Sequence, residues 1–286
     1  MSTSREASSA RLRARQIIHQ LKIRSPDELS IEDIAWVRGA LVREGPLEGA
    51  DGRLVRGSSR GTILVRGDIP EPGRKRLVIA HELGHFELHR DTDQAALCVE
   101  EDFHYWYKRR PEELEATEFA SELLMPDTFF RPRSELLKPS FEAIEVLARE
   151  FQTSLTATAV RYVESSLYRC ALVVSIHGKA KWLVRSEEFR HWIHPGSVLH
   201  ENTYAADFFR GNNLPTGRQT VLASAWIQEG HFDSTVTIEE ESRALPRYNT
   251  VLSLLWIDQD IEESDEEDDS RLDLDHFTPD GKRWRW

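Results

Sequence analysis

Two histidines, His81 and His85, enclose Glu82 in the pattern H-E-x-x-H. Four residues make about one turn of a helix, so both imidazoles project from the same face and can reach one small tetrahedral ion at about 2.0–2.1 Å. Glu82 lies about 100° around the helix, beside such an ion, where it can take a proton from a water that the metal activates. The pattern therefore predicts a hydrolytic metal site; the alternative is a surface helix with two solvated histidines.

The residues around this motif predict a buried helix. Residues 77–80, directly before it, are Leu, Val, Ile and Ala. Gly84, inside the motif, costs about 1 kcal/mol relative to alanine in a helix interior, and close approach of another backbone would explain it. Both features favour the metal site over the solvated alternative.

A third protein ligand must come from elsewhere, because a catalytic zinc takes three protein ligands and keeps one position open. The helix predicted after Pro111 carries five glutamates, Glu112, Glu113, Glu115, Glu118 and Glu122. Helical geometry puts Glu115, Glu118 and Glu122 on one stripe, which predicts a solvated acidic face. Glu113 shares the small and apolar stripe that must point inward, where a carboxylate needs a cation, so we expect Glu113 to be the third ligand.

His89 continues the stripe of His81 and His85 by one more turn. Eight residues of straight helix rise about 12 Å, too far for all three imidazoles to bind one ion. We therefore expect His89 either to support a ligand from behind or to line the cleft. The alternative is a histidine at a helix C-terminus, where the helix dipole favours it.

The segments R-K-R-L-V-I-A-H-E-L-G-H-F-E-L-H and E-L-E-A-T-E-F-A-S-E-L-L-M-P resemble the ImmA/IrrE family of zinc metallopeptidases. The similarity covers residues 30–164, about half the chain. It implies that His81, His85 and Glu113 bind one zinc ion and that Glu82 is catalytic. Family members commonly carry Asn or Asp where this chain has Thr117, a position that would orient a ligand, so the departure implies weaker metal binding, although Thr117 still offers a hydroxyl.

The same resemblance implies a function. Members typically cleave a helix-turn-helix transcriptional repressor after a stress signal such as DNA damage or phage attack, so a protein substrate of this kind is expected. An oxyanion donor is also expected, and the candidates are His104, Tyr105 and Tyr107, with packing aromatics as the alternative. The strand at 62–65 is a candidate edge for binding an extended substrate.

The sequence leaves three functions open. The first is a peptidase, and the second is a non-proteolytic regulator that binds a repressor or DNA and uses the metal helix as structure. A third hypothesis is a peptidase inhibited by its own tail.

Residues 141–164 resemble a helix-turn-helix in outline, but their second helix offers only Arg161 for DNA readout, so we expect it to pack as structure. A nucleic acid or a small molecule is a candidate activator. Residues 106–110 combine basic and aromatic side chains that suit contact with a nucleic-acid strand, with a solvated charged loop as the favoured alternative.

The spacing of apolar residues predicts both helices and strands, and hence an α+β protein. Together with the family resemblance it implies a zincin-like metallopeptidase domain with a short sheet and active-site helices, then a mixed β-rich domain and an acidic tail. Predicted helices are 10–21, a segment from Ser30, 74–89, 111–124, 141–151 and 155–164. Predicted strands are 41–43, 53–56, 62–66, 170–176, 180–185, 220–226, 235–238 and 250–257. The predicted divisions are an N-terminal helix (1–24), the peptidase domain (25–165), a sensor or partner-binding domain (166–257) and a flexible tail (258–286).

Charge and composition predict an acidic tail and indicate the cellular compartment. The net charge is −12, but residues 257–275 hold eleven acids and one arginine, so the tail accounts for most of it. Such a run predicts a solvated tail. The alternative is a tail that competes with a nucleic acid or an acidic partner for a basic surface. No apolar run approaches the roughly 20 residues that cross a bilayer. The two cysteines, Cys98 and Cys170, do not make a disulfide framework. We expect a cytoplasmic protein without membrane contact.

Overall fold

The computed structural model describes residues 8–57, 60–89, 97–98, 110–227 and 235–257. Its N-terminal part holds a four-stranded sheet in the order β1-β3-β2-β4, with the strands β1 (Ala40–Gly45), β2 (Gly52–Arg56), β3 (Gly61–Arg66) and β4 (Leu97–Cys98). The three strands predicted in this region are confirmed. Ile63 in β3 pairs with Val42 on one side and with Leu54 on the other. The expectation that residues 62–65 form a substrate-binding edge is therefore wrong, because β1 returns parallel to β3 and covers that edge.

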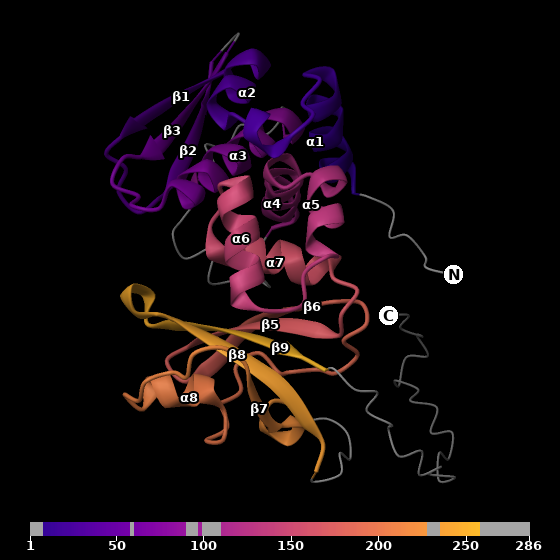
Figure 1. Ribbon diagram of the computed structural model, residues 1–286. Helices are drawn as coiled ribbons and strands as arrows, with labels where there is room; N and C mark the ends of the chain where they lie inside the picture. The colour runs from indigo at the N-terminus through magenta and orange to yellow at the C-terminus, as the bar shows by residue number, and fades with distance from the viewer. Residues whose placement is uncertain (1–7, 58–59, 90–96, 99–109, 228–234, 258–286) are drawn as a thin grey trace, which may run out of the picture.

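Four helices pack with this sheet: α1 (Ser9–Gln20), α2 (Ile31–Arg38), α3 (Pro72–Leu88) and α4 (Pro111–Leu124). Their shared core includes Ile17, Ile63, Leu83 and Phe119, all fully buried. The α3 and α4 helices lie at the centre of this half of the molecule (Figure 1). A short 3-10 turn, η1 (Pro26–Glu28), joins α1 to α2. The central helices are thus covered on several sides, which fixes their positions before any ligand binds.

Three further helices, α5 (Asp127–Ser134), α6 (Phe141–Phe151) and α7 (Leu155–Ser165), connect the two halves of the chain. Arg161, the residue that a DNA-reading helix would have to expose, is 1% exposed and pairs with Glu122 of α4 at 2.9 Å. The prediction that residues 141–164 pack as structure is therefore confirmed for this residue.

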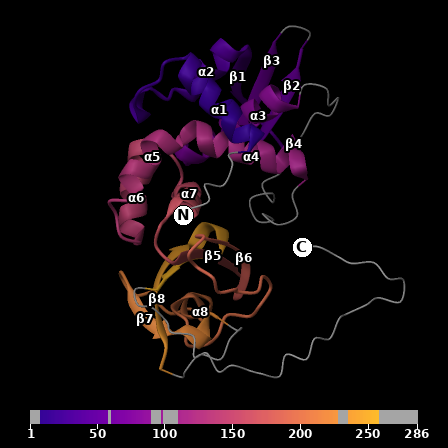
Figure 2. The same ribbon diagram turned by 90° about the vertical axis from the view of Figure 1, so that its right-hand side faces the viewer.

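The C-terminal part is a five-stranded antiparallel sheet in the order β6-β5-β9-β8-β7. Its strands are β5 (Cys170–Ile176), β6 (Lys179–Arg185), β7 (Gln219–Leu222), β8 (Thr237–Leu245) and β9 (Thr250–Trp256). Helices α6 and α7 cover one face, and the short helix α8 (Tyr204–Phe209) covers the other (Figure 2). The strand predicted at 220–226 ends at Leu222, because a 3-10 turn, η4 (Ala223–Ala225), follows, and α8 was not predicted.

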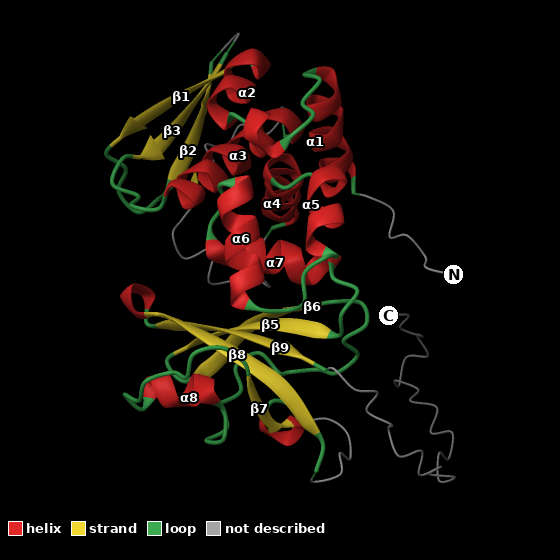
Figure 3. Cartoon of the chain, in the orientation of Figure 1, coloured by secondary structure: helices red, strands yellow, loops and turns green. Residues whose placement is uncertain are grey.

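The predicted α+β fold class is confirmed. Figure 3 shows two sheets separated by a layer of helices, and the C-terminal region is rich in strands. The acidic tail, 258–286, lies outside the described residues, and the division of the chain at residues 24 and 165 stays a prediction. No helix within the described ranges has the length and apolar character needed to cross a membrane.

Candidate metal centre

The site is built where α3 crosses α4. Pro72 begins α3 in its first turn, where the missing N–H costs nothing, and the helix then continues to Leu88. At the crossing, a methyl group placed on Gly84 would lie 3.0 Å from both the Cα and the carbonyl oxygen of Ala116 in α4. The close approach of a second backbone, predicted from this glycine, is confirmed. It brings the face of α3 that carries the histidines against α4.

Gly84→Ala is expected to loosen this crossing. Alanine improves helix propensity by about 1 kcal/mol, but the added methyl meets backbone atoms that cannot rotate away, and such overpacking costs about 1–3 kcal/mol. We expect lower stability in urea unfolding and weaker metal binding, because α4 must move away from α3. Unchanged stability together with unchanged metal affinity would contradict the role given to this contact.

The structure brings His81, His85 and Glu113 together from α3 and α4. The His81 Nε2 atom lies 3.1 Å from His85 Nε2 and 3.1 Å from Glu113 Oε2, and His85 Nε2 lies 3.4 Å from Glu113 Oε1. Ligands bound to zinc at about 2.0–2.2 Å in a tetrahedron lie about 3.3–3.6 Å apart. The three atoms therefore fit one small ion, and within the described ranges this is the one cluster of His, Cys, Asp and Glu side chains able to hold a metal.

The charge state of the Glu113 carboxyl suits the binding of a cation. Burial by itself raises the pKa of this carboxyl, but hydrogen bonds and charge interactions with His81 and His85 outweigh burial and hold the pKa well below its ordinary value. Glu113 is thus ionised at neutral pH, as a carboxylate ligand must be.

Glu82 lies on the same turn of α3 and is fully buried. Its side chain packs against β2 at Gly52, where an added methyl would lie 2.9 Å from Glu82 Oε1 and 2.5 Å from a methyl carbon of Val78. Only glycine leaves room there, so the strand backbone forms one wall of the Glu82 pocket. Sequence reasoning missed Gly52, because only its contact with α3 marks it as special.

Thr117 contacts His81 on the side of its Nδ1 atom. Its hydroxyl lies 3.3 Å from His81 Nδ1 and donates a hydrogen bond to the backbone oxygen of Glu113 at 2.8 Å. The hydroxyl proton is committed to that carbonyl, so the oxygen accepts from the Nδ1–H of His81 and leaves Nε2 directed at the other ligands. The role expected of an Asn or Asp at this position is open to the threonine in this chain.

His89 lies just beyond α3, in a non-helical conformation. Its Nδ1 atom is 3.0 Å from His85 Nδ1, and its Nε2 atom is 2.9 Å from Glu115 Oε2. His89 thus contacts His85, and it also lies at the C-terminus of α3, so the structure is compatible both with a supporting role and with a histidine favoured by the helix dipole. The predicted solvated stripe of Glu115, Glu118 and Glu122 is wrong for Glu122, which is fully buried; Glu115 bonds His89 but its side chain stays 47% exposed.

Arg56 of β2 holds the C-terminal end of α3. Its guanidinium donates hydrogen bonds to the backbone oxygens of His85, Phe86 and His89. The His85 carbonyl also accepts the backbone N–H of His89 at 3.1 Å. The last carbonyls of a helix lack the full set of partners found in its interior, and a cation at a helix C-terminus is stabilised by the helix dipole. The backbone that carries His85 and His89 is therefore fixed by β2, an arrangement that the sequence alone gave no reason to expect.

The oxyanion candidates His104, Tyr105 and Tyr107 lie outside the described residues, as do Lys108 and Arg109 of the basic cluster. Their proposed roles stay predictions.

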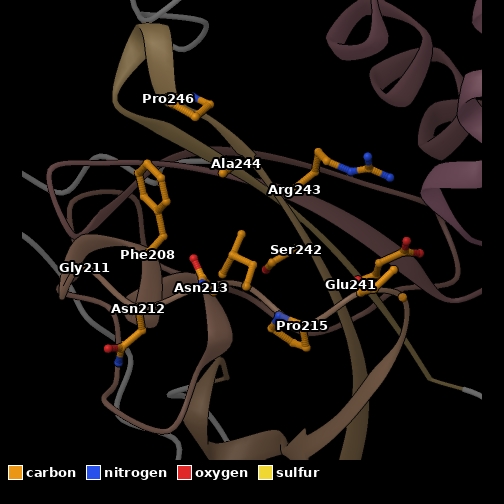
Figure 4. Close-up of a pocket in the computed structure, with 13 residues that line it drawn as sticks. Phe208, Gly211, Asn212, Asn213, Pro215, Glu241, Ser242, Arg243, Ala244 and Pro246 are labelled. Atoms are coloured by element: carbon orange, nitrogen blue, oxygen red, sulfur yellow. The ribbon is translucent and has the colours of Figure 1, made fainter.

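A hollow of about 520 Å³ lies in the C-terminal part, between β8 and the loop after α8. Phe208, Asn213 and Pro215 line it, while Glu241 and Arg243 of β8 point away from these residues toward the helices (Figure 4). Both charged side chains are engaged there: Glu241 accepts from the backbone N–H of Phe141 at 2.9 Å, and Arg243 pairs with Glu145 at 3.1 Å. The strand that walls the hollow is thus tied directly to α6.

Comparison with known proteins agrees with this geometry. Among solved structures, a Mycobacterium tuberculosis transcriptional regulator is similar over 86% of this chain and 76% of its own, with a TM-score of 0.56 and 14% sequence identity, so the two share a fold. Comparison with curated proteins finds no match. The family model Peptidase M78, described as the IrrE N-terminal-like domain, matches residues 37–162, a range that contains α3, α4 and the whole metal cluster. Residues 37–162, less than half of this chain, thus match the IrrE N-terminal-like domain of the peptidase M78 family, in agreement with the predicted resemblance to the ImmA/IrrE family.

Proposed function

We propose that this chain is a zinc-dependent endopeptidase with one zinc ion per chain. The observation that carries the proposal is the convergence of His81, His85 and Glu113 at ligand distances, with Glu82 on the same turn of α3. Two imidazoles and one carboxylate are the protein ligands of several zinc peptidases, and they leave a fourth position open. The M78 domain assignment supports the same reaction.

Each residue then has a distinct task. Zinc held there would polarise the scissile carbonyl and make a water more acidic. Glu82 takes the proton of the attacking water and returns it to the leaving amine. Gly52 and Val78 enclose the Glu82 side chain, which limits its rotation, while Thr117 directs His81.

We propose a helix-turn-helix transcriptional repressor as the substrate, cleaved in the cytoplasm in response to stress, DNA damage or phage attack. The family assignment supports this substrate class, and the similar solved structure is titled as a transcriptional regulator. The β-rich region is proposed to sense a signal or bind a partner, and the hollow beside β8 is the place where a small-molecule activator would fit.

Zinc content tests the metal site directly. Purified wild-type protein is expected to hold about one zinc per chain, and Glu113→Ala to lose most of it, because only the two imidazoles remain. Elemental analysis of both proteins at the same pH measures this, with Glu112→Ala as the matched control, since Glu112 lies on the same helix and is exposed. Cleavage of a panel of helix-turn-helix repressors by the zinc-loaded protein is the next assay.

Equal zinc content in wild type and Glu113→Ala would refute the three-ligand site. The alternative function, a regulator that binds a repressor or DNA without cleaving, would then lead. Direct DNA reading by α7 is not favoured, because Arg161 is buried in an ion pair.

A further inference from the structure

The ligand His85 has two ring nitrogens with different neighbours. Its Nε2 atom faces His81 and Glu113, at 3.1 Å and 3.4 Å, where a metal would bind. Its Nδ1 atom faces away from that point and lies 3.0 Å from Nδ1 of His89. The orientation of the His85 ring, and with it the direction of Nε2, therefore depends on the hydrogen bond between His85 Nδ1 and His89 Nδ1.

His89 is held in turn by α4. Its Nε2 atom lies 2.9 Å from Glu115 Oε2, while its side chain is only 9% exposed and that of Glu115 is 47% exposed. The end of α3 makes this contact possible: the helix stops at Leu88, and His89 turns out of the helical path with φ −115° and ψ 51°. A straight helix would instead carry the imidazole about 12 Å along the axis from His81.

The chemistry of the three groups fixes the direction of each hydrogen bond. A carboxylate only accepts, so His89 Nε2 carries the hydrogen and donates it to Glu115. In a neutral imidazole the other nitrogen then accepts, so His89 Nδ1 receives a hydrogen bond from His85 Nδ1. This leaves the lone pair of His85 Nε2 directed at the metal position, the tautomer that a metal ligand needs.

We propose that Glu115 is a positioning residue, which acts through His89 to fix the ring and the tautomer of the zinc ligand His85. Thr117 does the same for His81 through one hydroxyl. Glu113, Glu115 and Thr117 thus make α4 the helix that supplies one ligand and orients the other two. The proposal rests on the zinc site of the proposed function.

Two variants of the full-length protein test this inference, Glu115→Ala and His89→Phe. Each removes one hydrogen bond of the chain, and phenylalanine keeps a ring in the space of His89. We expect zinc to bind about 10–100-fold more weakly in both, as is typical when the group behind a histidine ligand is removed. The zinc dissociation constant is measured by competition with a chelator of known affinity, and Glu112→Ala is the matched control because Glu112 is exposed on the same helix.

Two further readouts separate positioning from general destabilisation. The visible absorption of the cobalt-substituted protein is expected to change in Glu115→Ala and not in Glu112→Ala, since it reports ligand geometry. The double variant should bind zinc no more weakly than His89→Phe alone, because both residues act through one contact with His85.

Zinc affinity and a cobalt spectrum like those of wild type in Glu115→Ala would overturn the proposal. If Glu113→Ala still lost zinc in that case, the proposed peptidase site would stand and only the positioning role would fail. A wild-type protein that bound no zinc would overturn both.

Discussion

Glu82→Gln is expected to abolish repressor cleavage while zinc stays bound. Glutamine has nearly the shape of glutamate, so it fits between Gly52 and Val78, where Glu82 is fully buried. It cannot take up the proton of the attacking water, and loss of such general base catalysis typically costs about 10²–10⁴-fold in rate. Single-turnover cleavage of a repressor measures the rate, and elemental analysis of the same sample measures the zinc.

The control for this variant is Glu112→Gln, which makes the same chemical change on an exposed side chain and should cleave like wild type. Retained zinc with lost cleavage would identify an enzyme. A regulator that acts only by binding a repressor or DNA would keep its regulatory activity in Glu82→Gln. Cleavage at the wild-type rate would remove Glu82 from the mechanism. Loss of both zinc and cleavage would point instead to a disturbed α3.

The local part of the site could be predicted from the sequence because it lies within one helix. His81, Glu82 and His85 occupy adjacent turns, and their geometry follows from the helical repeat alone. Glu113 required one more step, the identification of the inward stripe of a second helix, and the structure places it 3.1 Å from His81. Gly84 signalled that the two helices approach closely, although it did not say which residue it would meet.

The parts that failed depend on partners from elsewhere in the chain. Helical spacing put Glu115 and Glu122 on a solvated face. Glu115 is 47% exposed but also bonds His89, a contact that the spacing did not indicate, whereas Arg15 and Arg161 surround the fully buried Glu122. The partners of Glu122 lie 107 and 39 residues away in the sequence. A stripe on one helix shows which residues share a direction and not what lies in that direction.

The predicted edge strand failed for a similar reason. The segment 62–65 reads as a short apolar strand, which fits an edge or an interior position equally well. Only the return of β1 alongside β3, with Val42 opposite Ile63, makes it interior. Of the C-terminal strands, β5 and β9 were located correctly, while the end of β7 was placed too late. The strand predicted at 235–238 was also wrong in its bounds, because β8 runs over Thr237–Leu245.

Glu122→Gln is expected to cost about 3–5 kcal/mol of unfolding free energy, the usual loss when one partner of a buried ion pair is removed. Glu122 is fully buried and accepts from Arg161 at 2.9 Å, from Arg15 at 2.8 Å and from the backbone N–H of Asp127 at 3.1 Å. Burial lowers the pKa of the Arg161 guanidinium, and the charge of Glu122 is the main cause that opposes this. Without it, the buried charge of Arg161 is left with the weaker influence of Glu164 and of Asp127, which lies 3.5 Å away.

Urea unfolding of Glu122→Gln, compared with Glu118→Gln, measures this cost. Glu118 belongs to the same sequence stripe, so its variant should stay within about 0.5 kcal/mol of wild type if burial and pairing decide the outcome. The double variant Glu122→Leu with Arg161→Leu should recover part of the loss, because replacing both partners of a buried pair by apolar side chains is often neutral or stabilising. A loss in Glu122→Gln no larger than in Glu118→Gln would show that the ion pair does not hold these helices together.

The same variant should also weaken zinc binding, although Glu122 touches no ligand. Glu122 joins α4 to α1 through Arg15 and to α7 through Arg161, and α4 carries Glu113, Glu115 and Thr117. Loss of these ion pairs lets α4 shift relative to α3, and the three ligand atoms, which lie 3.1 Å, 3.1 Å and 3.4 Å apart, must stay near the tetrahedral spacing of about 3.3–3.6 Å to share one ion. Wild-type zinc affinity in a destabilised Glu122→Gln protein would show instead that the contact at Gly84 alone sets the spacing of the two helices.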